Sequence, residues 1–264
     1  METLLLYLAL GIVVGIISGL FGVGGGLIVV PALVLIFQYQ GISGEVLMHL
    51  AIGTSLATIV ATSISSALAH NRHGMVLWPV VCGLAPALVG GALLGAVLAD
   101  RLSSTLLQGL FAVYTLTAAL QLAFFKPSPR WQLPKRAGLL GVGTVIGTIS
   151  SLVGIGGGSL TTPFLVWCNK SVREAVTTSA VCGVPIAIAG ATGFLISGLN
   201  EQGLPAMSNG YIYWPAWLGI SIGSVCAAPL GARFAHRLPQ TTLKKLFALL
   251  LAIIAAKMLW SAQL

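Results

Sequence analysis

Two matching glycine stretches, each inside a long apolar run, are the parts of this sequence best suited to chemistry. They read Gly-Val-Gly-Gly-Gly at residues 22–26 and Gly-Ile-Gly-Gly-Gly at residues 154–158. Glycines that interrupt a membrane helix leave backbone N–H and C=O groups unpaired, which is tolerated only where those groups are buried in protein or line a wet cavity. Helices that begin after Gly26 and Gly158 would direct their N–H groups and positive dipole ends at this gap. The pattern therefore predicts an anion site built from backbone amides.

Hydroxyl side chains accompany both stretches and could supply neutral donors, from which a bound anion can be released. Serines precede each stretch, and a Thr-Ser pair recurs in the next helix of each half. The predicted substrate-binding residues are Gly22, Gly24, Gly25, Gly26, Gly154, Gly156, Gly157, Gly158, Ser18, Ser150, Thr54, Ser55, Thr178 and Ser179. The alternative for each hydroxyl is a bond to a carbonyl one helical turn earlier, or a contact that holds two helices together.

Ionisable side chains near these residues are scarce. His49 and Arg173 lie about one turn before the two Thr-Ser pairs. Facing a cavity, His49 could titrate near physiological pH and couple transport to protons, while Arg173 could attract anions. Their position near a helix start favours the membrane interface instead.

No pattern of catalytic or metal-binding residues is present in the sequence. It lacks HExxH, GxSxG and Walker motifs, and its four cysteines form no CxxC pair. We therefore expect no catalytic residue, no metal and no cofactor.

The composition places these residues in a membrane. Of the 264 residues, 57% are hydrophobic and 7% are charged, whereas an average soluble domain carries about 25% charged residues. Hydrocarbon satisfies no backbone hydrogen bond, and long apolar runs without alternation demand helices rather than a barrel. The expected fold class is an all-α polytopic membrane protein, and the net charge of +8 is interpreted as a topology signal rather than a sign of a nucleic-acid partner.

Six apolar runs approach or reach the length of roughly 20 residues that a spanning helix needs. They are residues 46–68, 75–98, 104–125, 172–196, 213–235 and 243–261. Two longer runs, 4–37 and 137–168, are each broken by a glycine stretch, either as a re-entrant hairpin or as two spans.

The two halves of the chain are copies of each other. A shift of 132 residues aligns the two glycine stretches and places Pro31 on Pro163. We expect repeat 1 at residues 1–125, a basic linker at 126–136 and repeat 2 at 137–264. With the linker in the cytoplasm, all 13 Lys and Arg residues except Arg101 and Lys257 fall on the cytoplasmic side, and the second repeat is inverted. Inverted repeats opened by broken helices are typical of secondary transporters.

These motifs resemble the TauE/SafE sulfite-exporter family, also called the 4-toluene sulfonate uptake permease family, over essentially the whole chain. The resemblance rests on the doubled glycine stretches with their prolines, the Gly-Thr-Ser55 helix and the basic linker. It implies a multi-pass carrier of the bacterial inner membrane that moves small sulfur-containing anions, such as sulfite, sulfonates, sulfoacetate or thiosulfate, mostly outward.

Three functions are compatible with these features. The first is a secondary transporter for a small sulfur-containing oxyanion, with alternating access between inverted repeats. The second is an anion channel with the same glycine-lined pathway. The third is a membrane enzyme or assembly factor for a sulfur species, which would need a reactive group such as Cys82 or Cys182. The expected partners are the small anion and the lipid bilayer, and the glycine-rich faces leave a homodimer open.

Overall fold

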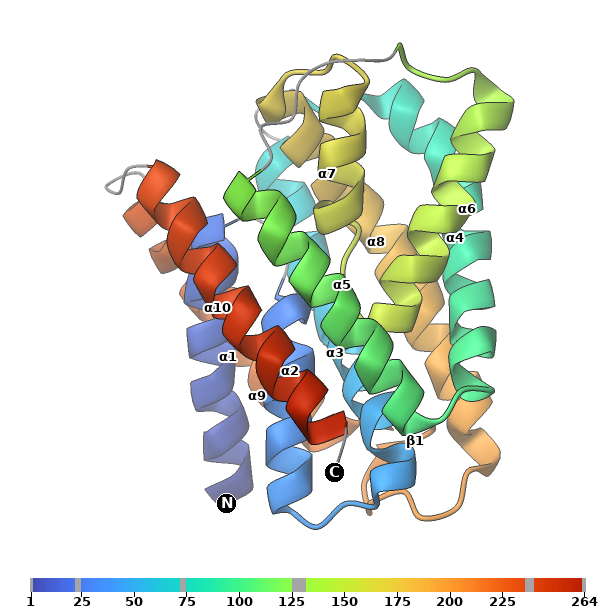
Figure 1. Ribbon diagram of the computed structural model, residues 1–264, viewed down its shortest axis with the longest axis vertical. Coiled ribbons are helices and arrows are strands. Elements are labelled where there is room, and N and C mark those ends of the chain that lie inside the picture. The colour runs from blue at the N-terminus through green and yellow to red at the C-terminus, as the bar shows by residue number, and fades with distance from the viewer. Residues whose placement is uncertain (1, 22–24, 72–74, 125–131, 236–239, 263–264) are drawn as a thin grey trace.

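The computed structural model describes residues 2–21, 25–71, 75–124, 132–235 and 240–262, which form a bundle of long helices (Figure 1). The helices are α1 (Glu2–Phe21), α2 (Gly26–Tyr39), α3 (Gly44–Asn71), α4 (Trp78–Asp100), α5 (Ser104–Phe124), α6 (Arg136–Val153), α7 (Gly158–Trp167), α8 (Val172–Ser197), α9 (Trp214–Ala235) and α10 (Gln240–Ala262). A short 3-10 helix, η1 (Gly198–Asn200), and two strands of two residues, β1 (Ser208–Asn209) and β2 (Ile212–Tyr213), lie between α8 and α9. Each of the six predicted spans corresponds to one helix, and five of the described helices are long and apolar enough to cross a membrane. The all-α polytopic fold class is confirmed.

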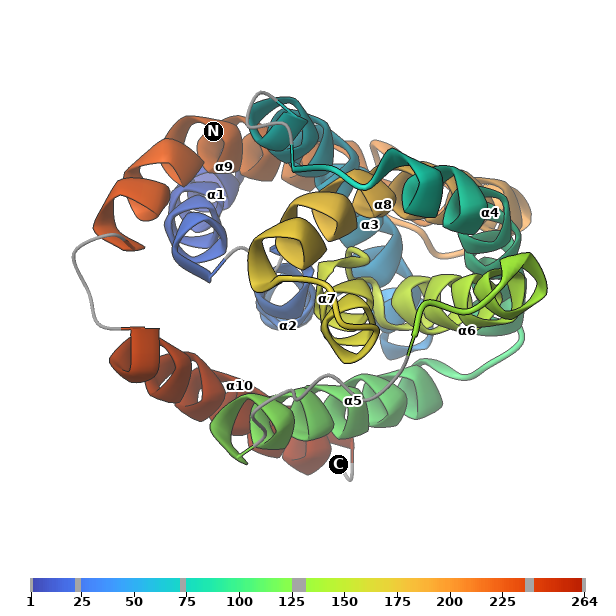
Figure 2. The ribbon, with the colours of Figure 1, turned by 90° about the horizontal axis from the view of Figure 1, so that it is seen from above.

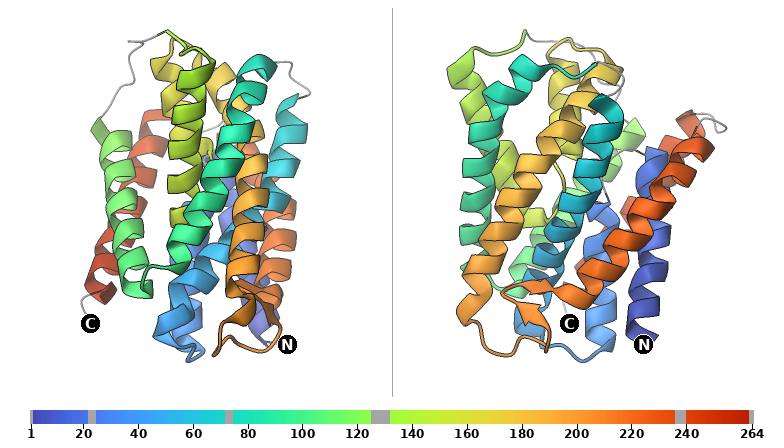
Figure 3. Two further views of the ribbon diagram at one scale, coloured as in Figure 1. Left: turned by 90° about the vertical axis from the view of Figure 1, so that its right-hand side faces the viewer. Right: turned by 180° about the vertical axis from the view of Figure 1, so that it is seen from behind.

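Each glycine-broken run folds as a helical hairpin that returns to the end where it began (Figures 1 and 3). In the first hairpin, α1 is long and α2 begins near mid-height; in the second, α6 is followed by the short α7. Gly154 ends α6 with a positive φ of 72°, a conformation that glycine adopts without a steric penalty. Pro31 and Pro163 both lie inside the returning helices. The runs are therefore hairpins rather than pairs of complete spans.

The two halves run in opposite directions. Figure 1 shows α1 rising from the lower end and α6 descending from the upper end, and each later helix of one half opposes its counterpart in the other. Their packing is reciprocal, because α1 lies against α9 and α6 lies against α4. Glycines bring both pairs close: a Cβ on Gly11 would lie 2.6 Å from the Ile220 carbonyl oxygen, and one on Gly143 would lie 2.8 Å from the Ala87 Cβ. Each half thus contributes helices to both sides of the molecule.

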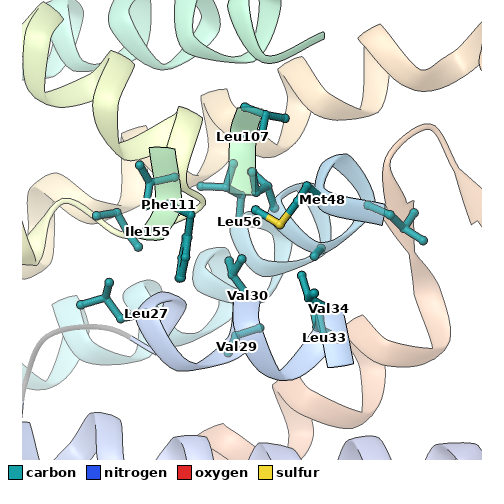
Figure 4. Close-up of a cluster of buried hydrophobic side chains, with 14 of the residues drawn as sticks. Leu27, Val29, Val30, Leu33, Val34, Met48, Leu56, Leu107, Phe111 and Ile155 are labelled. Atoms are coloured by element: carbon teal, nitrogen blue, oxygen red, sulfur yellow. The ribbon is translucent and has the colours of Figure 1, made fainter. Parts of the chain in front are cut away.

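The remaining helices surround these pairs. Helices α3 and α8 pack together in the centre, and α5 and α10 form a layer along one face (Figure 2). Helix α2 faces α3 and α5 in a buried apolar cluster that includes Leu27, Val30, Leu56 and Phe111 (Figure 4). Ile155, from the second glycine stretch, belongs to the same cluster. The break in the second half is therefore anchored in the core.

Positive charge gathers at one end of the bundle, the upper end of Figure 1, which we call the basic end. The start of α6, the turn from α7 to α8 and the start of α10 lie there and carry Lys135, Arg136, Lys170, Arg173 and Lys245. Arg101, which follows α4, and Lys257, in the last turns of α10, lie toward the opposite end.

Candidate anion-binding site

The two glycine breaks meet inside the bundle. A Cβ on Gly26 would lie 2.6 Å from the carbonyl oxygen of Gly154 and 2.9 Å from the Cα of Ile155. The Ser55 hydroxyl of α3 donates a hydrogen bond of 2.9 Å to the same Gly154 carbonyl. The start of α2 and the end of α6 are therefore in direct contact, and only a residue without a side chain fits between them.

A cavity lies beside the second break. It holds about 470 Å³ of space free of atoms, counting its open mouth. The lining consists of small and hydroxyl-bearing residues with one isoleucine: Ser18, Ile59, Thr62, Ser63, Ser66, Gly156, Gly157, Gly158, Ser179, Ala180 and Gly183. Helix α3 contributes its C-terminal half and α8 its N-terminal half, so the cavity occupies the half of the molecule nearer the basic end. Among the described residues, the lining carries no charged side chain.

The start of α7 supplies backbone donors to this cavity. Gly157 is the N-cap residue and Gly158 the first residue of a helix of 10 residues. The first N–H groups of a helix have no acceptor within that helix, and its dipole favours negative charge there. One turn on, the Thr161 hydroxyl is fully buried, has no partner in the described part of the chain, and lies 3.3 Å from where a Gly157 Cβ would be. Amides and hydroxyls in this geometry can bind an oxyanion without a fixed cation.

Most hydroxyls in or next to the cavity already have partners. Ser179 Oγ lies 2.7 Å from Thr162 Oγ1 and donates to the Val176 carbonyl at 2.9 Å. Thr62 and Ser63 each bond a carbonyl of α3 one turn earlier. A hydroxyl bond to a carbonyl one turn earlier adds little stability to a helix. Rotation about χ1 can therefore break these bonds and turn the hydroxyls toward an incoming anion.

Apart from Thr54 and Thr178, the predicted substrate-binding residues fall into three groups. Ser18, Gly156, Gly157, Gly158 and Ser179 line the cavity. Gly25, Gly26, Gly154, Ser55 and Ser150 are buried around the breaks without lining it. Gly22 and Gly24 lie outside the described residues.

Thr54 and Thr178 make a matched pair of structural contacts away from the cavity. The backbone N–H of Tyr213 donates to Thr54 Oγ1 at 3.0 Å, and that of Leu77 donates to Thr178 Oγ1 at 3.0 Å. Tyr213 and Leu77 immediately precede α9 and α4. Both threonines are fully buried and hold the start of a helix from the other half of the chain.

His49 and Arg173 also lie away from the cavity. His49 is 5% exposed, and its Nε2 lies 3.0 Å from the Ala99 carbonyl oxygen and 3.1 Å from that of Leu102. Both partners are acceptors, so Nε2 carries the proton and caps the end of α4. Arg173 is exposed at the basic end. Tyr211, whose ring stacks on His49 at 5.0 Å, donates to Asp100, and its burial raises the pKa of its phenol well above the ordinary value.

Sequence reasoning missed three lining residues, Thr62, Ser63 and Ser66. They continue the face of α3 that begins at Ser55 and passes through Ile59, at spacings of three and four residues. That helical spacing is the signal that could have identified them.

Comparisons with known proteins show that this chain is similar to membrane transporters. The family model for the sulfite exporter TauE/SafE matches residues 7–258. A probable membrane transporter protein of Haemophilus influenzae is 38% identical over 258 residues, covering 97% of each chain. A probable membrane transporter protein of Methanocaldococcus jannaschii is 31% identical, covering 96% of this chain and 94% of its own, and the probable membrane transporter protein YdhB of Bacillus subtilis is 27% identical, covering 93% and 96%. A match across nearly the whole chain, on a fold with paired glycine breaks, shows that the protein belongs to the TauE/SafE family of membrane transporters.

Proposed function

We propose that this protein is a secondary transporter that carries a small sulfur-containing oxyanion, such as sulfite or an organosulfonate, outward across the bacterial inner membrane. The observation that carries the proposal is the cavity at the start of α7, which combines backbone donors with hydroxyls. Repeat 1 (residues 1–125) and repeat 2 (137–264) would rock about this site, with the linker at 126–136 in the cytoplasm.

The cavity lining is suited to bind an anion and to release it again. The absence of a side chain at Gly156, Gly157 and Gly158 allows an oxyanion to approach the backbone closely. Preorganised dipoles replace the water lost on entry. Because the donors are neutral, no ion pair has to be broken for release.

The position of the cavity supports loading from the basic end. Lys170 and Arg173 precede and begin α8, whose N-terminal half lines the cavity. Positive charge at the end of the bundle nearer the cavity raises the local concentration of anions and their rate of entry. With that end in the cytoplasm, as the positive-inside bias favours, loading there corresponds to export.

Two alternatives make different predictions. A channel needs an open path through both halves of the molecule, whereas α3 and α8 line the cavity only with their halves nearer the basic end. A membrane enzyme would need a reactive group, and neither Cys82, which is exposed, nor Cys182, which is buried, lines the cavity.

Counterflow in proteoliposomes tests the proposal. We expect saturable counterflow of labelled sulfite, sulfoacetate, taurine or thiosulfate, with sulfate as a comparison anion. Flux that rises without saturation and shows no counterflow would establish the channel instead. The absence of flux for every sulfur oxyanion would contradict the proposed substrate class.

The Ser179→Ala variant tests the site itself. A hydrogen bond to a charged group contributes about 1.5–3 kcal/mol, so we expect the half-saturation concentration for counterflow to rise at least tenfold. Thr117→Ala is the matched control, because the Thr117 hydroxyl is exposed on α5 and bonds only the Tyr114 carbonyl. Equal half-saturation constants in the two variants would remove Ser179 from the site.

A further inference from the structure

The half of the molecule opposite the cavity contains the counterparts of the cavity residues. The alignment of the glycine stretches pairs Ser18 with Ser150, and the alignment of the Thr-Ser pairs places Ser179 on Ser55. Ser18 and Ser179 line the cavity, whereas Ser150 and Ser55 are fully buried. The same arrangement of serines beside a glycine break is therefore present twice. It lines a cavity on one side of the breaks and is buried on the other.

Two hydroxyls on the closed side have no partner. Ser150 and Ser151, in the last turn of α6, are fully buried, and neither Oγ has a hydrogen-bond partner among the residues that the structure describes. A buried hydroxyl without a partner destabilises the fold, so most native hydroxyls find one. Ser55 differs, because its proton is used on the Gly154 carbonyl. This conformation therefore leaves two adjacent buried donors without an acceptor in the described part of the chain.

The space around these hydroxyls is closed by glycines of α8 and by the Leu56 side chain of α3. A Cβ on Gly190 of α8 would lie 3.1 Å from Ser151 Oγ and 3.0 Å from the Leu56 side chain of α3. Further along α8, a Cβ on Gly193 would lie 2.5 Å from the Ala96 Cβ. We call the contact of Leu56, Ser151 and Gly190 the closed seam. On α8, the residues at these two contacts, Gly190 and Gly193, carry no side chain.

We propose that Ser150 and Ser151 form a second half-site for the same small oxyanion, which opens toward the opposite end when the cavity at the basic end closes. This inference rests on the proposed function, because it supplies the state from which the anion leaves. Both half-sites offer neutral hydroxyls beside a glycine break, so the anion exchanges one set of donors for a smaller set of the same kind.

Ile59 separates the two half-sites. The shift that aligns Ser55 with Ser179 places Ile59 on Gly183, and both line the cavity. The Ile59 side chain reaches within 2.9 Å of a Gly26 Cβ position and 3.3 Å of a Gly156 Cβ position, so it touches both breaks. An anion that moves between the half-sites must pass this side chain.

Labelling from one side tests the opening without requiring a known substrate. The Ser151→Cys variant is made in a background with all four native cysteines replaced by alanine. A membrane-impermeant maleimide is then added on the side of the membrane that the end opposite the basic end faces. We expect labelling although the position is fully buried in this structure, and protection by sulfoacetate, which does not react with maleimide. Ser224→Cys is the matched control, because Ser224 is also fully buried but lies where α9 packs on Gly15 of α1. If Ser151→Cys labels no faster than Ser224→Cys, the proposal is overturned.

Side-specific transport tests the binding role. We expect Ser150→Ala and Ser151→Ala to raise the half-saturation concentration for sulfite about tenfold when it is added at the opposite end, and less than twofold at the basic end. Ser18→Ala should show the reverse asymmetry. Ser150→Ala and Ser151→Ala should melt no lower than the parent, since each loses an unpaired buried hydroxyl, and this separates a binding defect from misfolding. An equal change on both sides, or no change, would contradict the second half-site.

Failure of the parent to transport any sulfur oxyanion would instead count against the proposed function. The labelling experiment would still report whether the closed seam opens.

Discussion

The half of the pathway at the basic end and the half at the opposite end share a backbone plan but differ in their side chains. On α3, the cavity is lined by Thr62, Ser63 and Ser66. The corresponding positions of α8 are Ile186, Ala187 and Gly190, none of which carries a hydroxyl. A duplicated scaffold can give two related conformations, yet the hydroxyls are concentrated in one of them. The comparison teaches that duplication of the backbone does not carry the side chains with it: in the transport that we propose, the repeats would supply the motion, and the side-chain asymmetry would favour loading from one side.

Gly26 is the position where a substitution should have the largest effect, because the two halves touch there. A Cβ would lie 2.6 Å from the Gly154 carbonyl oxygen, so Gly26→Ala forces the breaks apart. Overpacking of this kind costs roughly 1–3 kcal/mol, and we expect loss of counterflow together with a lower melting temperature. Gly109→Ala on α5 serves as the control, since its Cβ would meet no atom within 4 Å and Gly109 does not line the cavity. A stable and active Gly26→Ala would show that the contact between the breaks is dispensable.

Ile59→Ala would remove the side chain that separates the cavity from the proposed second half-site. We expect a passive leak of anion, measured as flux that is not stimulated by substrate on the other side. Truncating a buried isoleucine also costs about 2–5 kcal/mol. Ile220→Ala, at a fully buried position on α9, should lose similar stability without a leak. Equal leaks in both variants would attribute the flux to general loosening.

Thr54→Val and Thr178→Val sharpen the distinction between structural and binding hydroxyls. Each variant leaves a backbone N–H without its acceptor, which costs about 1–3 kcal/mol. We therefore expect lower melting temperatures, with the half-saturation concentration changed less than twofold. A rise comparable to that of Ser179→Ala would place these threonines in the binding site after all.

His49→Gln should have the smallest effect. The glutamine amide can still donate to a carbonyl at the end of α4, so we expect a loss of stability of less than about 1 kcal/mol. Because His49 lies outside the cavity, the half-saturation concentration at the basic end should not change. Comparing counterflow with and without a proton gradient checks this, and loss of gradient dependence in the variant would assign the coupling role to His49.

Much of the fold could be predicted because the helices are determined by local sequence and by the hydrocarbon that surrounds them. Apolar length defines α3, α4, α5, α8, α9 and α10, and glycine ends α6 at residue 154. The site was predicted less completely. Ser179 lines the cavity, whereas its neighbour Thr178 points to the N–H of Leu77. Adjacent residues of a helix diverge by about 100°, so a motif locates a helix segment without specifying which side chain faces the cavity.

The sequence alone determined the membrane environment, the helices, the duplication and the places where the chain breaks, because hydrocarbon and glycine act on every segment separately. Only the tertiary structure decided that Gly26 meets Gly154, that Thr54 and Thr178 bond the backbone, and that Ser150 and Ser151 stay unpaired. These outcomes depend on how each helix is rotated about its axis and which helix of the other half it packs against. That choice is made jointly by all the contacts of the bundle, and no short stretch of sequence contains it.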